Sequence, residues 1–278
     1  MQLVGYEPSG RGSALLLADG GAVERHELLA GEDLSYSLGD RRCAGVLDDG
    51  AHVACDRPSA PYCEYHTDTW VCARCTGTCL KDEMDCFEDH AVYLAAFAPD
   101  TFKIGVTREW RLETRLREQG ADRAVHLYTV SNGRIAREIE AAIARRLTDR
   151  VRTGTKVAAL ASAVDETAWE ATLSGLEGFV ADAAGDDITF EFDPAAEDLE
   201  PGVRAEFEFD YGLDLAARPV RETIARGTVV GLKGRLLVLE NGQTNYAVDV
   251  RDLVGYDLER EDGTTGRNLQ ASLGSFGG

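Results

Sequence analysis

Seven cysteines lie within 44 residues, from Cys43 to Cys86, and this crowding constrains the fold more than any other feature of the chain. The first residues show no signal-peptide pattern, and no apolar run reaches the ~18 residues that a membrane span needs. We therefore expect a cytoplasmic protein without membrane contact, a compartment in which thiols stay reduced. Metal binding, rather than a disulfide framework, is the predicted use of these cysteines.

The spacing of the cysteines is typical of zinc sites. Cys63 and His66 form a C-x2-H pair, and Cys72 and Cys75 form a C-x2-C pair. One tight turn can present both members of such a pair to a tetrahedral ion. We predict two closed, structural zinc sites, the first formed by Cys43, Cys55, Cys63 and His66, and the second by Cys72, Cys75, Cys79 and Cys86, with His90 as the alternative to one of these ligands. Interchanged ligands, a single site with spare thiols, or buried free cysteines are the other interpretations.

The charge of the chain is strongly acidic but uneven. There are 49 acidic and 29 basic residues, a formal net charge of −20, and only four lysines. Acidic residues dispersed in this way indicate adaptation to molar salt, as in halophilic archaea, where charge repulsion is screened within ~3 Å; an acidic interaction surface is the alternative. Residues 101–152 are the exception, with 12 basic and 7 acidic residues. This segment is a candidate anion-binding surface, unless its helices merely pair their own charges.

Hydrophobic periodicity predicts mixed secondary structure. Residues 1–40 read as strands joined by tight turns, and the strongest later hairpin signal is the turn at 240–243. Helices are expected from Thr107 (as cap) to Gln119, ended by Gly120, from 131–133 onward, and over 165–184. The expected strands are 92–97, 102–106, 125–130, 188–192, 203–209, 227–232, 235–239 and 246–250. Residues 1–40 are expected to complete the C-terminal β structure, a small barrel or twisted sheet, and to bring the two ends of the chain together.

The segment from His90 to Asp149 contains an ordered set of polar residues. Tyr93 lies on the first strand and Lys103-Ile104-Gly105 on the second, and Arg111, Arg115 and Glu140 follow on helices. In this order and spacing the segment resembles the GIY-YIG endonuclease superfamily, in the variant where the second tyrosine is replaced and the motif reads K-I-G-x-T. The resemblance covers about 60 of the 278 residues.

This resemblance implies a magnesium-dependent phosphodiesterase. Tyr93 would lie near the attacking water, and Lys103 would replace the second tyrosine of the general-base arrangement. Arg115 (or Arg111) would neutralise charge on the scissile phosphate, and Glu140 would hold one Mg²⁺. Nucleic acid would contact Arg108, Arg111, Arg115 and Arg137. A protonated Lys103 cannot accept a proton, so it either has a lowered pKa or binds phosphate without cleavage.

Each residue also has a structural interpretation. Tyr93 can be a core residue, Glu140 can form a salt bridge with Arg137, and the arginines can line solvent. Gly105 and Gly120 can serve the backbone, at a bulge and at a helix C-cap.

Most of the chain also resembles an uncharacterised cysteine-rich family, domain of unknown function 2797. The shared residues are Thr78-Cys79, Cys86, His90, 92–95, 103–108, Thr114-Arg115, 119–121, Glu140 and 231–234. This resemblance implies no activity.

We therefore expect an α+β protein with a zinc-binding cysteine module, a GIY-YIG-like α/β unit and β-rich segments at both ends. The expected divisions are 1–40 (β segment), 41–90 (zinc module), 91–184 (GIY-YIG-like domain with an extra helix), 185–260 (β domain) and 261–278 (disordered tail). Three functions compete: a nuclease, a nucleic-acid-binding module that does not cleave, and a protein-interaction scaffold. Loss of turnover in Glu140→Ala with binding intact would distinguish the first.

Overall fold

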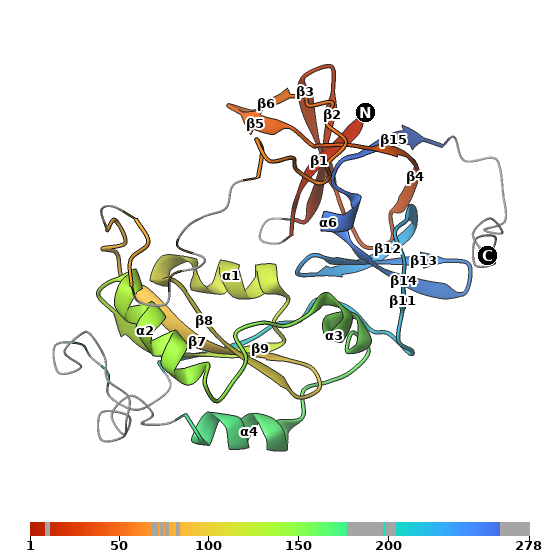
Figure 1. Ribbon diagram of the computed structural model, residues 1–278. Coiled ribbons are helices and arrows are strands. Elements are labelled where there is room, and N and C mark those ends of the chain that lie inside the picture. Colours follow the sequence, from red (N-terminus) through yellow and green to blue (C-terminus); the bar gives the residue numbers. More distant parts are fainter. Residues whose placement is uncertain are drawn as a thin grey trace, which may run out of the picture.

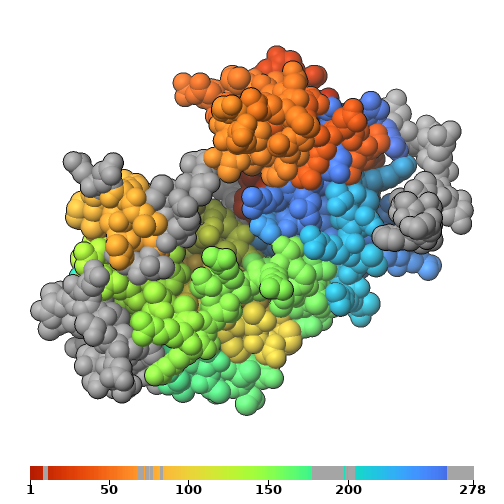
Figure 2. Space-filling view, viewed as in Figure 1, coloured from red at the N-terminus to blue at the C-terminus, as the bar shows by residue number. Residues whose placement is uncertain are grey.

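Two β-sheets of unequal size form the framework of the protein in a computed structural model (Figure 1). The structure describes residues 1–8, 12–67, 72, 75, 78–81, 84–176, 197, 199 and 204–261. Within these residues the larger sheet has nine strands and the smaller has four. A space-filling view shows the two parts as masses in contact, with the ends of the chain in one and its middle in the other (Figure 2). The fold is α+β, as predicted.

The larger sheet joins the two ends of the chain. Its strand order is β11-β14-β13-β12-β4-β15-β1-β2-β3. The strands are β1 (Gln2–Glu7), β2 (Ala14–Asp19), β3 (Ala22–Glu27), β4 (Asp33–Arg41), β11 (Val220–Arg221), β12 (Ala225–Lys233), β13 (Leu236–Asn241), β14 (Thr244–Asp249) and β15 (Tyr256–Arg260). β1 pairs with β15, and β4 lies between β15 and β12. The expectation that residues 1–40 complete the C-terminal sheet is confirmed.

Strand β13 lies at the centre of the packing on the larger sheet. Leu237 and Leu239 pack with other buried residues of this sheet, including Leu253 of the short helix α6 (Val250–Leu253). Leu236 and Val238 point to the other face and pack against helix α3 (Thr153–Ala158). The hairpin between β13 and β14 turns at Gly242, whose φ of +69° suits glycine, in agreement with the predicted turn.

The smaller sheet is buried on both faces. It has the order β10-β9-β7-β8, formed by β7 (His90–Phe97), β8 (Thr101–Arg108), β9 (Arg123–Val130) and β10 (Ala205–Glu208). Every residue of β7 is buried, and alternate side chains point to opposite faces. Val92 and Leu94 pack with helix α2 (Gly133–Ile143) and helix α4 (Glu166–Ser174), whereas Tyr93 and Ala95 pack with helix α1 (Leu112–Gln119). The strands expected at 92–97, 102–106 and 125–130 are therefore present, each slightly longer.

Helix α1 starts later than predicted. Thr107 does not cap it, because its backbone remains in the β-ladder opposite Ala91. The chain stays extended to Arg108, forms a 3₁₀ turn over Glu109–Arg111 and only then enters the α-helix. The predicted end is confirmed, since Gly120 is the C-cap in the left-handed conformation, with a φ of +69°.

The two other predicted helices begin as expected. Asn132 caps α2 through hydrogen bonds from two backbone amides, and Asp165 caps α4. Helix α4 ends at Ser174, earlier than the predicted 165–184, and Gly175 follows as its C-cap. The rest of that range from residue 177 on, the strand predicted at 188–192, and the start of 203–209 lie outside the described residues. Among described residues, no helix is long and apolar enough to cross a membrane.

Candidate functional site

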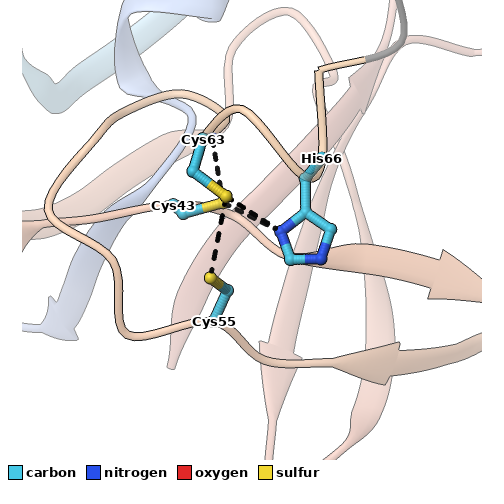
Figure 3. Close-up of side chains that lie close together, drawn as sticks. All are labelled: Cys43, Cys55, Cys63 and His66. Atoms are coloured by element: carbon cyan, nitrogen blue, oxygen red, sulfur yellow. Dashed lines mark hydrogen bonds between the residues drawn. The ribbon is translucent and has the colours of Figure 1, made fainter.

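Three cysteines and one histidine from separate loops meet beside the larger sheet. Cys43 follows β4, Cys55 follows the hairpin of β5 (Val46–Asp48) and β6 (Ala51–Val53), and Cys63 and His66 lie on one turn (Figure 3). The turn is held by hydrogen bonds from the amides of His66 and Thr67 to the carbonyl of Cys63. All four ligand atoms lie within 4.8 Å of one another. The first predicted ligand set is thus brought together.

The distances in this cluster fit a tetrahedral zinc ion. The Nδ1 atom of His66 is 3.3 Å from the Cys43 sulfur and 3.4 Å from the Cys63 sulfur, and the Cys55 and Cys63 sulfurs are 4.0 Å apart. Zn–S bonds of ~2.3 Å in a tetrahedron place two sulfurs about 3.8 Å apart. The cluster can therefore hold a metal ion such as zinc with little movement, and its four protein ligands leave no position for substrate.

Backbone amides surround the thiol groups of this cluster. The amides of Gly45 and Cys63 donate to the Cys43 sulfur at 3.4 and 3.2 Å. Burial raises the pKa of Cys63, but amide hydrogen bonds and the neighbouring thiols outweigh it and lower that pKa to about 7. Gly45 has a φ of +67°, and a Cβ there would lie 2.1 Å from the carbonyl oxygen of Val53. A glycine is therefore required where the chain leaves Cys43 and passes the β5–β6 hairpin.

The second predicted ligand set lies apart from the first, around a large cavity. Cys72, Cys75, Cys79, Cys86 and His90 all line this cavity. Among the described residues, Cys43, Cys55, Cys63 and His66 form the only cluster of ligand atoms, so the second set is not drawn together in this conformation. Cys86 and His90 are near each other, because a Cβ on Gly133 would lie 3.1 Å from the Cβ of Cys86 and 2.8 Å from Nε2 of His90.

The orientation of His90 bears on its role as a ligand. Its Nδ1 lies 2.6 Å from the carbonyl oxygen of Glu88, which can only accept a hydrogen bond. This contact places the proton on Nδ1 and leaves the lone pair on Nε2, the atom that faces Cys86. Burial lowers the pKa of His90, which favours the neutral ring that a metal needs.

The large cavity has a volume of about 740 Å³ and is strongly basic. Among the described residues, eight cationic side chains and three carboxylates line it, in a chain whose net charge is −20. The cations are Lys81, Lys103, Arg108, Arg111, Arg115, Arg134, Arg137 and Arg150, and the acids are Asp85, Glu140 and Asp149. We call it the basic cavity. The basic excess predicted for residues 101–152 is thus concentrated where an anion can enter.

One hydrogen-bonded chain crosses the wall of the basic cavity. Lys103 donates to Oε1 of Gln119 at 2.7 Å, and Nε2 of Gln119 donates to the Tyr93 hydroxyl at 2.6 Å. Tyr93 is only 1% exposed, and its hydroxyl reaches the cavity by lying over Gly105, its partner across the β-ladder. A Cβ at Gly105 would be 2.5 Å from that hydroxyl oxygen. The prediction of a bulge at Gly105 is wrong, because the β7–β8 register is continuous there and glycine instead makes room for the tyrosine ring.

Arg111 of the 3₁₀ turn and Arg115 of α1 both line the basic cavity and share one counter-ion. Glu118 accepts from Arg111 at 3.1 Å and from Arg115 at 3.3 Å. The charge of one carboxylate is thus divided between two guanidinium groups, and each keeps donors for a further anion. Both Arg111 and Arg115 are close to half exposed, so an anion can reach them.

Glu140 lies on α2, with its side chain only 14% exposed and 2.6 Å from Arg137. The salt bridge is the structural interpretation offered above. Glu140 still lines the basic cavity together with Asp149, and Mg²⁺ in nucleotide sites is often held by one or two carboxylates and the phosphate itself. Glu140 and Asp149 could therefore hold such an ion in this cavity.

Lys103 and Tyr93 in the basic cavity both have shifted pKa values. Burial, and then the positive charge of Arg115, lowers the pKa of Lys103 to about 8. Burial also raises the pKa of Tyr93, so its hydroxyl stays protonated. Near neutral pH a fraction of Lys103 is therefore the neutral amine that a proton acceptor must be.

All predicted catalytic and nucleic-acid-binding residues line the same cavity: Tyr93, Lys103, Arg108, Arg111, Arg115, Arg137 and Glu140. The sequence analysis missed two contributors. Gln119 connects Lys103 to Tyr93, and Trp110 stands at the rim with 70% of its surface exposed and its ring nitrogen bonded to Glu88. The position of Gln119 at the end of a helix is common for glutamine, so the sequence gives no sign of its role. The role of Trp110 becomes visible only in the structure, where its ring is exposed in the 3₁₀ turn.

Comparison with known families gives one match. The family described as "Protein of unknown function (DUF2797)" matches residues 40–258, which include the cysteine cluster, the basic cavity and the C-terminal strands. No curated protein and no solved structure matches the chain.

Proposed function

We propose that this chain, which belongs to the DUF2797 family, binds nucleic acid in the basic cavity and hydrolyses its phosphodiester bonds with the help of a divalent ion. One observation supports the proposal above all. Tyr93, Lys103, Arg115 and Glu140, far apart in the sequence, line a single cavity whose charge is opposite to that of the whole chain. These are the positions that the resemblance to the GIY-YIG endonucleases assigns to catalysis.

The binding step follows from the charges. The excess of five cations over acids in the wall of the basic cavity favours a phosphate chain over a neutral ligand. Arg111 and Arg115 offer paired N–H donors, and exposed Trp110 offers a flat ring against which a base can stack. The Arg–Glu118 pairs keep the guanidinium groups oriented before the phosphate arrives.

The chemical step uses the hydrogen-bonded chain. A water molecule attacks phosphorus as the bond to the leaving oxygen breaks, and its proton passes to neutral Lys103. Gln119 holds the Lys103 amine and the Tyr93 hydroxyl in a fixed relation, and Arg115 stabilises the charge that develops on the phosphate. Glu140 would hold Mg²⁺, which when bound polarises the phosphate.

We propose that the cysteine cluster has a structural role. A zinc ion bound by Cys43, Cys55, Cys63 and His66 would hold three segments together: the loop after β4, the β5–β6 hairpin and the turn at residues 63–66. We propose a second zinc at Cys72, Cys75 and Cys79 with Cys86 or His90, which would shape one wall of the basic cavity.

A cleavage assay on labelled DNA and RNA with Mg²⁺ or Mn²⁺ tests the catalytic proposal. We expect metal-dependent cleavage by the wild type, and loss of at least ~100-fold in Glu140→Ala with binding retained, because the proposed metal ligand is removed while Arg137, freed from its ion pair, keeps its positive charge in the cavity. Glu113→Ala is the matched control, since Glu113 is exposed on α1 and pairs with Arg117 outside the cavity. Binding without cleavage by the wild type would refute the nuclease and leave the binding module.

The binding module has its own supporting observation. At pH 7 most of Lys103 is protonated, since its pKa is about 8, and Glu140 already has a partner in Arg137. Arg115→Glu should lower affinity for oligonucleotides ~10-fold or more at low salt, while Arg117→Glu on the same helix should not, because Arg117 does not line the basic cavity. Equal affinity of the two variants would refute both candidate functions.

A further inference from the structure

A second cavity lies where the two sheets meet. Its volume is about 390 Å³, and we call it the junction cavity. Tyr6 of β1, the end of α1, the first turn of α3 and the β12–β13 turn line it. Helices α1 and α3 both lie on the side of the smaller sheet that faces β12–β14 (Figure 1). The contact is close: the turn at Gly234 packs on the C-cap of α1, where a Cβ on Gly234 would lie 2.7 Å from the amide nitrogen of Gly120.

The junction cavity is also basic. Arg115, Lys156, Lys233 and Arg235 line it, and Glu118 is the one carboxylate among the described residues that line it. Two of the cations have carboxylate partners close by, since Lys233 pairs with Asp122 and Arg235 with Asp249 at 3.0 Å. Arg115 shares Glu118 with Arg111. The remaining cation, Lys156, is the least compensated.

Burying the positive charge of Lys156 costs free energy that the contacts of its amine do not offset. Its amine donates to the carbonyl oxygen of Gln119 at 2.6 Å and lies 4.4 Å from the centre of the Phe97 ring. In the described part of the chain no carboxylate comes within ion-pair distance of this amine. Burial lowers the pKa of Lys156 to about 7, together with the nearby positive charges, among which Lys103 has the largest effect. An anion in the junction cavity would supply the missing charge.

The rarity of lysine makes this placement informative. The chain has four lysines in 278 residues, and three of them, Lys103, Lys156 and Lys233, gather around the end of α1. Lys103 and Lys156 bind the side chain and the backbone of the same residue, Gln119. Three of the four lysine amines of this acidic chain therefore lie at one place, and an ammonium group binds phosphate as a compact point charge.

Arg115 connects the two cavities, because it lines both. We propose that the junction cavity binds a second phosphate group of the same nucleic-acid strand that enters the basic cavity, so that the strand passes Arg115 and ends its contacts at Lys156. This inference rests on the proposed function. It adds that the strand must be long enough to span both cavities and that Lys156 is a binding residue without a catalytic role.

Oligothymidylates and oligouridylates of graded length test the inference, with zinc-loaded Glu140→Gln protein and no added Mg²⁺ or Mn²⁺, so that nothing is cleaved. We expect affinity to rise from ~3 nucleotides and to level off only at ~6 or more. Lys156→Gln should lower the affinity for the long oligonucleotides ~3- to 10-fold and reduce the slope of log K against log salt by about one, with no effect on the shortest. Arg117→Gln, on α1 but outside both cavities, is the control.

The outcomes separate the two proposals. Affinity that levels off at the shortest length, together with an unchanged salt slope in Lys156→Gln, would overturn the inference and leave nucleic-acid binding in the basic cavity intact; the cations of the junction would then be interface ion pairs only. Absence of binding at every length would overturn both proposals. The length series uses an intact junction, so it decides the question even if Lys156→Gln fails to fold.

Discussion

The hydroxyl of Tyr93 lies where the Cβ of any other residue at position 105 would have to go, at a separation of 2.5 Å. The K-I-G triplet therefore has a local physical meaning. Isoleucine packs in the core beneath α2, lysine lines the basic cavity, and glycine leaves space for the ring of the facing strand. At this scale the motif describes one tyrosine and the residues that position it.

We expect Gly105→Ala to displace the Tyr93 ring and to lower the free energy of unfolding by ~1–3 kcal/mol, as overpacking does. The Gln119–Tyr93 hydrogen bond should be lost with it, and any cleavage activity should fall. Urea denaturation measures the first effect. Gly154→Ala is the matched control, because Gly154 lies in α3 with no atom near its Cβ position, and alanine there should be neutral or stabilising. Equal stability of Gly105→Ala and wild type would refute the close contact.

Lys156 predicts a dependence of stability on pH. Its pKa is about 7 in the folded protein and 10.5 as the ordinary value, so the folded state binds fewer protons between these limits. Unfolding then takes up protons, and stability rises with pH by up to ~1.4 kcal/mol per unit across this window. Below pH 7 the penalty is present in full.

Lys156→Met removes the group that causes this penalty. We expect the variant to be more stable than wild type near pH 6.5, and the difference to shrink toward pH 10, since the penalty decreases as the pH approaches 10.5, above which the lysine is neutral in both states. Urea denaturation at several pH values, at constant KCl and without phosphate, measures it. A difference that does not change with pH would contradict the assignment.

At the residue scale, sequence showed which side chains carry charge but not which ones are connected. The order Tyr93, Lys103, Arg115, Glu140 could be read from spacing, since alternation in strands and helical periodicity place residues on faces. The roles of Gln119 and Gly105 depend on distances of ~3 Å across elements, which no periodicity encodes.

At the scale of elements, the cysteine cluster is held by three segments that form little regular structure of their own. The β5–β6 hairpin has three residues per strand and exposes Val46, Leu47 and Val53. Such a segment buries little apolar surface of its own, and a metal ion at the cysteine cluster would supply free energy that burial supplies elsewhere.

Zinc analysis of purified protein tests both metal sites. We expect about two zinc ions per chain in the wild type and one in each of Cys55→Ser and Cys79→Ser, because each variant removes one ligand from one site. Cys55→Ser should also lower the melting temperature, and a strong chelator should do the same to wild type. If Cys79→Ser keeps the wild-type zinc content, the second site is wrong. If Cys55→Ser keeps it, the first site is wrong.

Element boundaries were predictable wherever a residue with backbone consequences marked them. Asn132, Asp165, Gly120 and Gly242 end or begin their elements as expected. The start of α1 was not, because pairing of Thr107 with Ala91 extends β8 past the point where a threonine could cap a helix. Tertiary pairing overrode local propensity there.

At the scale of the whole molecule, charge separates the protein into unlike regions. Residues 101–152 carry an excess of five positive charges, so the remainder carries a net charge of −25. The basic cavity therefore lies in a protein whose other residues carry a large negative charge. This charge repels polyanions at a distance, and high ionic strength screens the repulsion.

We expect the melting temperature to rise as KCl increases from ~0.2 M to ~2 M, because screening at molar salt acts over ~3 Å and weakens repulsion among the carboxylates. Thermal denaturation followed by circular dichroism in a KCl series measures this. A melting temperature that is constant or falls over the series would refute adaptation of this chain to salt.

How much of the fold can be predicted from the sequence depends on how far apart in the chain the contacting residues lie. The unit from β7 to α4 is continuous in the chain, and its strands and helices could be ordered from local patterns. The nine-stranded sheet pairs β1 with β15, more than 250 residues apart, and only its general outcome, that the ends meet, was predictable. Which strands pair at such separation depends on side-chain packing across the whole sheet, which local sequence patterns do not indicate.

That same pairing sets an order of events during synthesis. β1 leaves the ribosome before every other described strand, yet its neighbour β15 is made after all of them. The unit from β7 to α4 can fold while the chain is still growing, whereas β1 and β4 must wait with unpaired backbone edges. A chain that stops before β15 therefore carries a finished basic cavity and an unfinished sheet, a state that proteases and chaperones would recognise by its open edges.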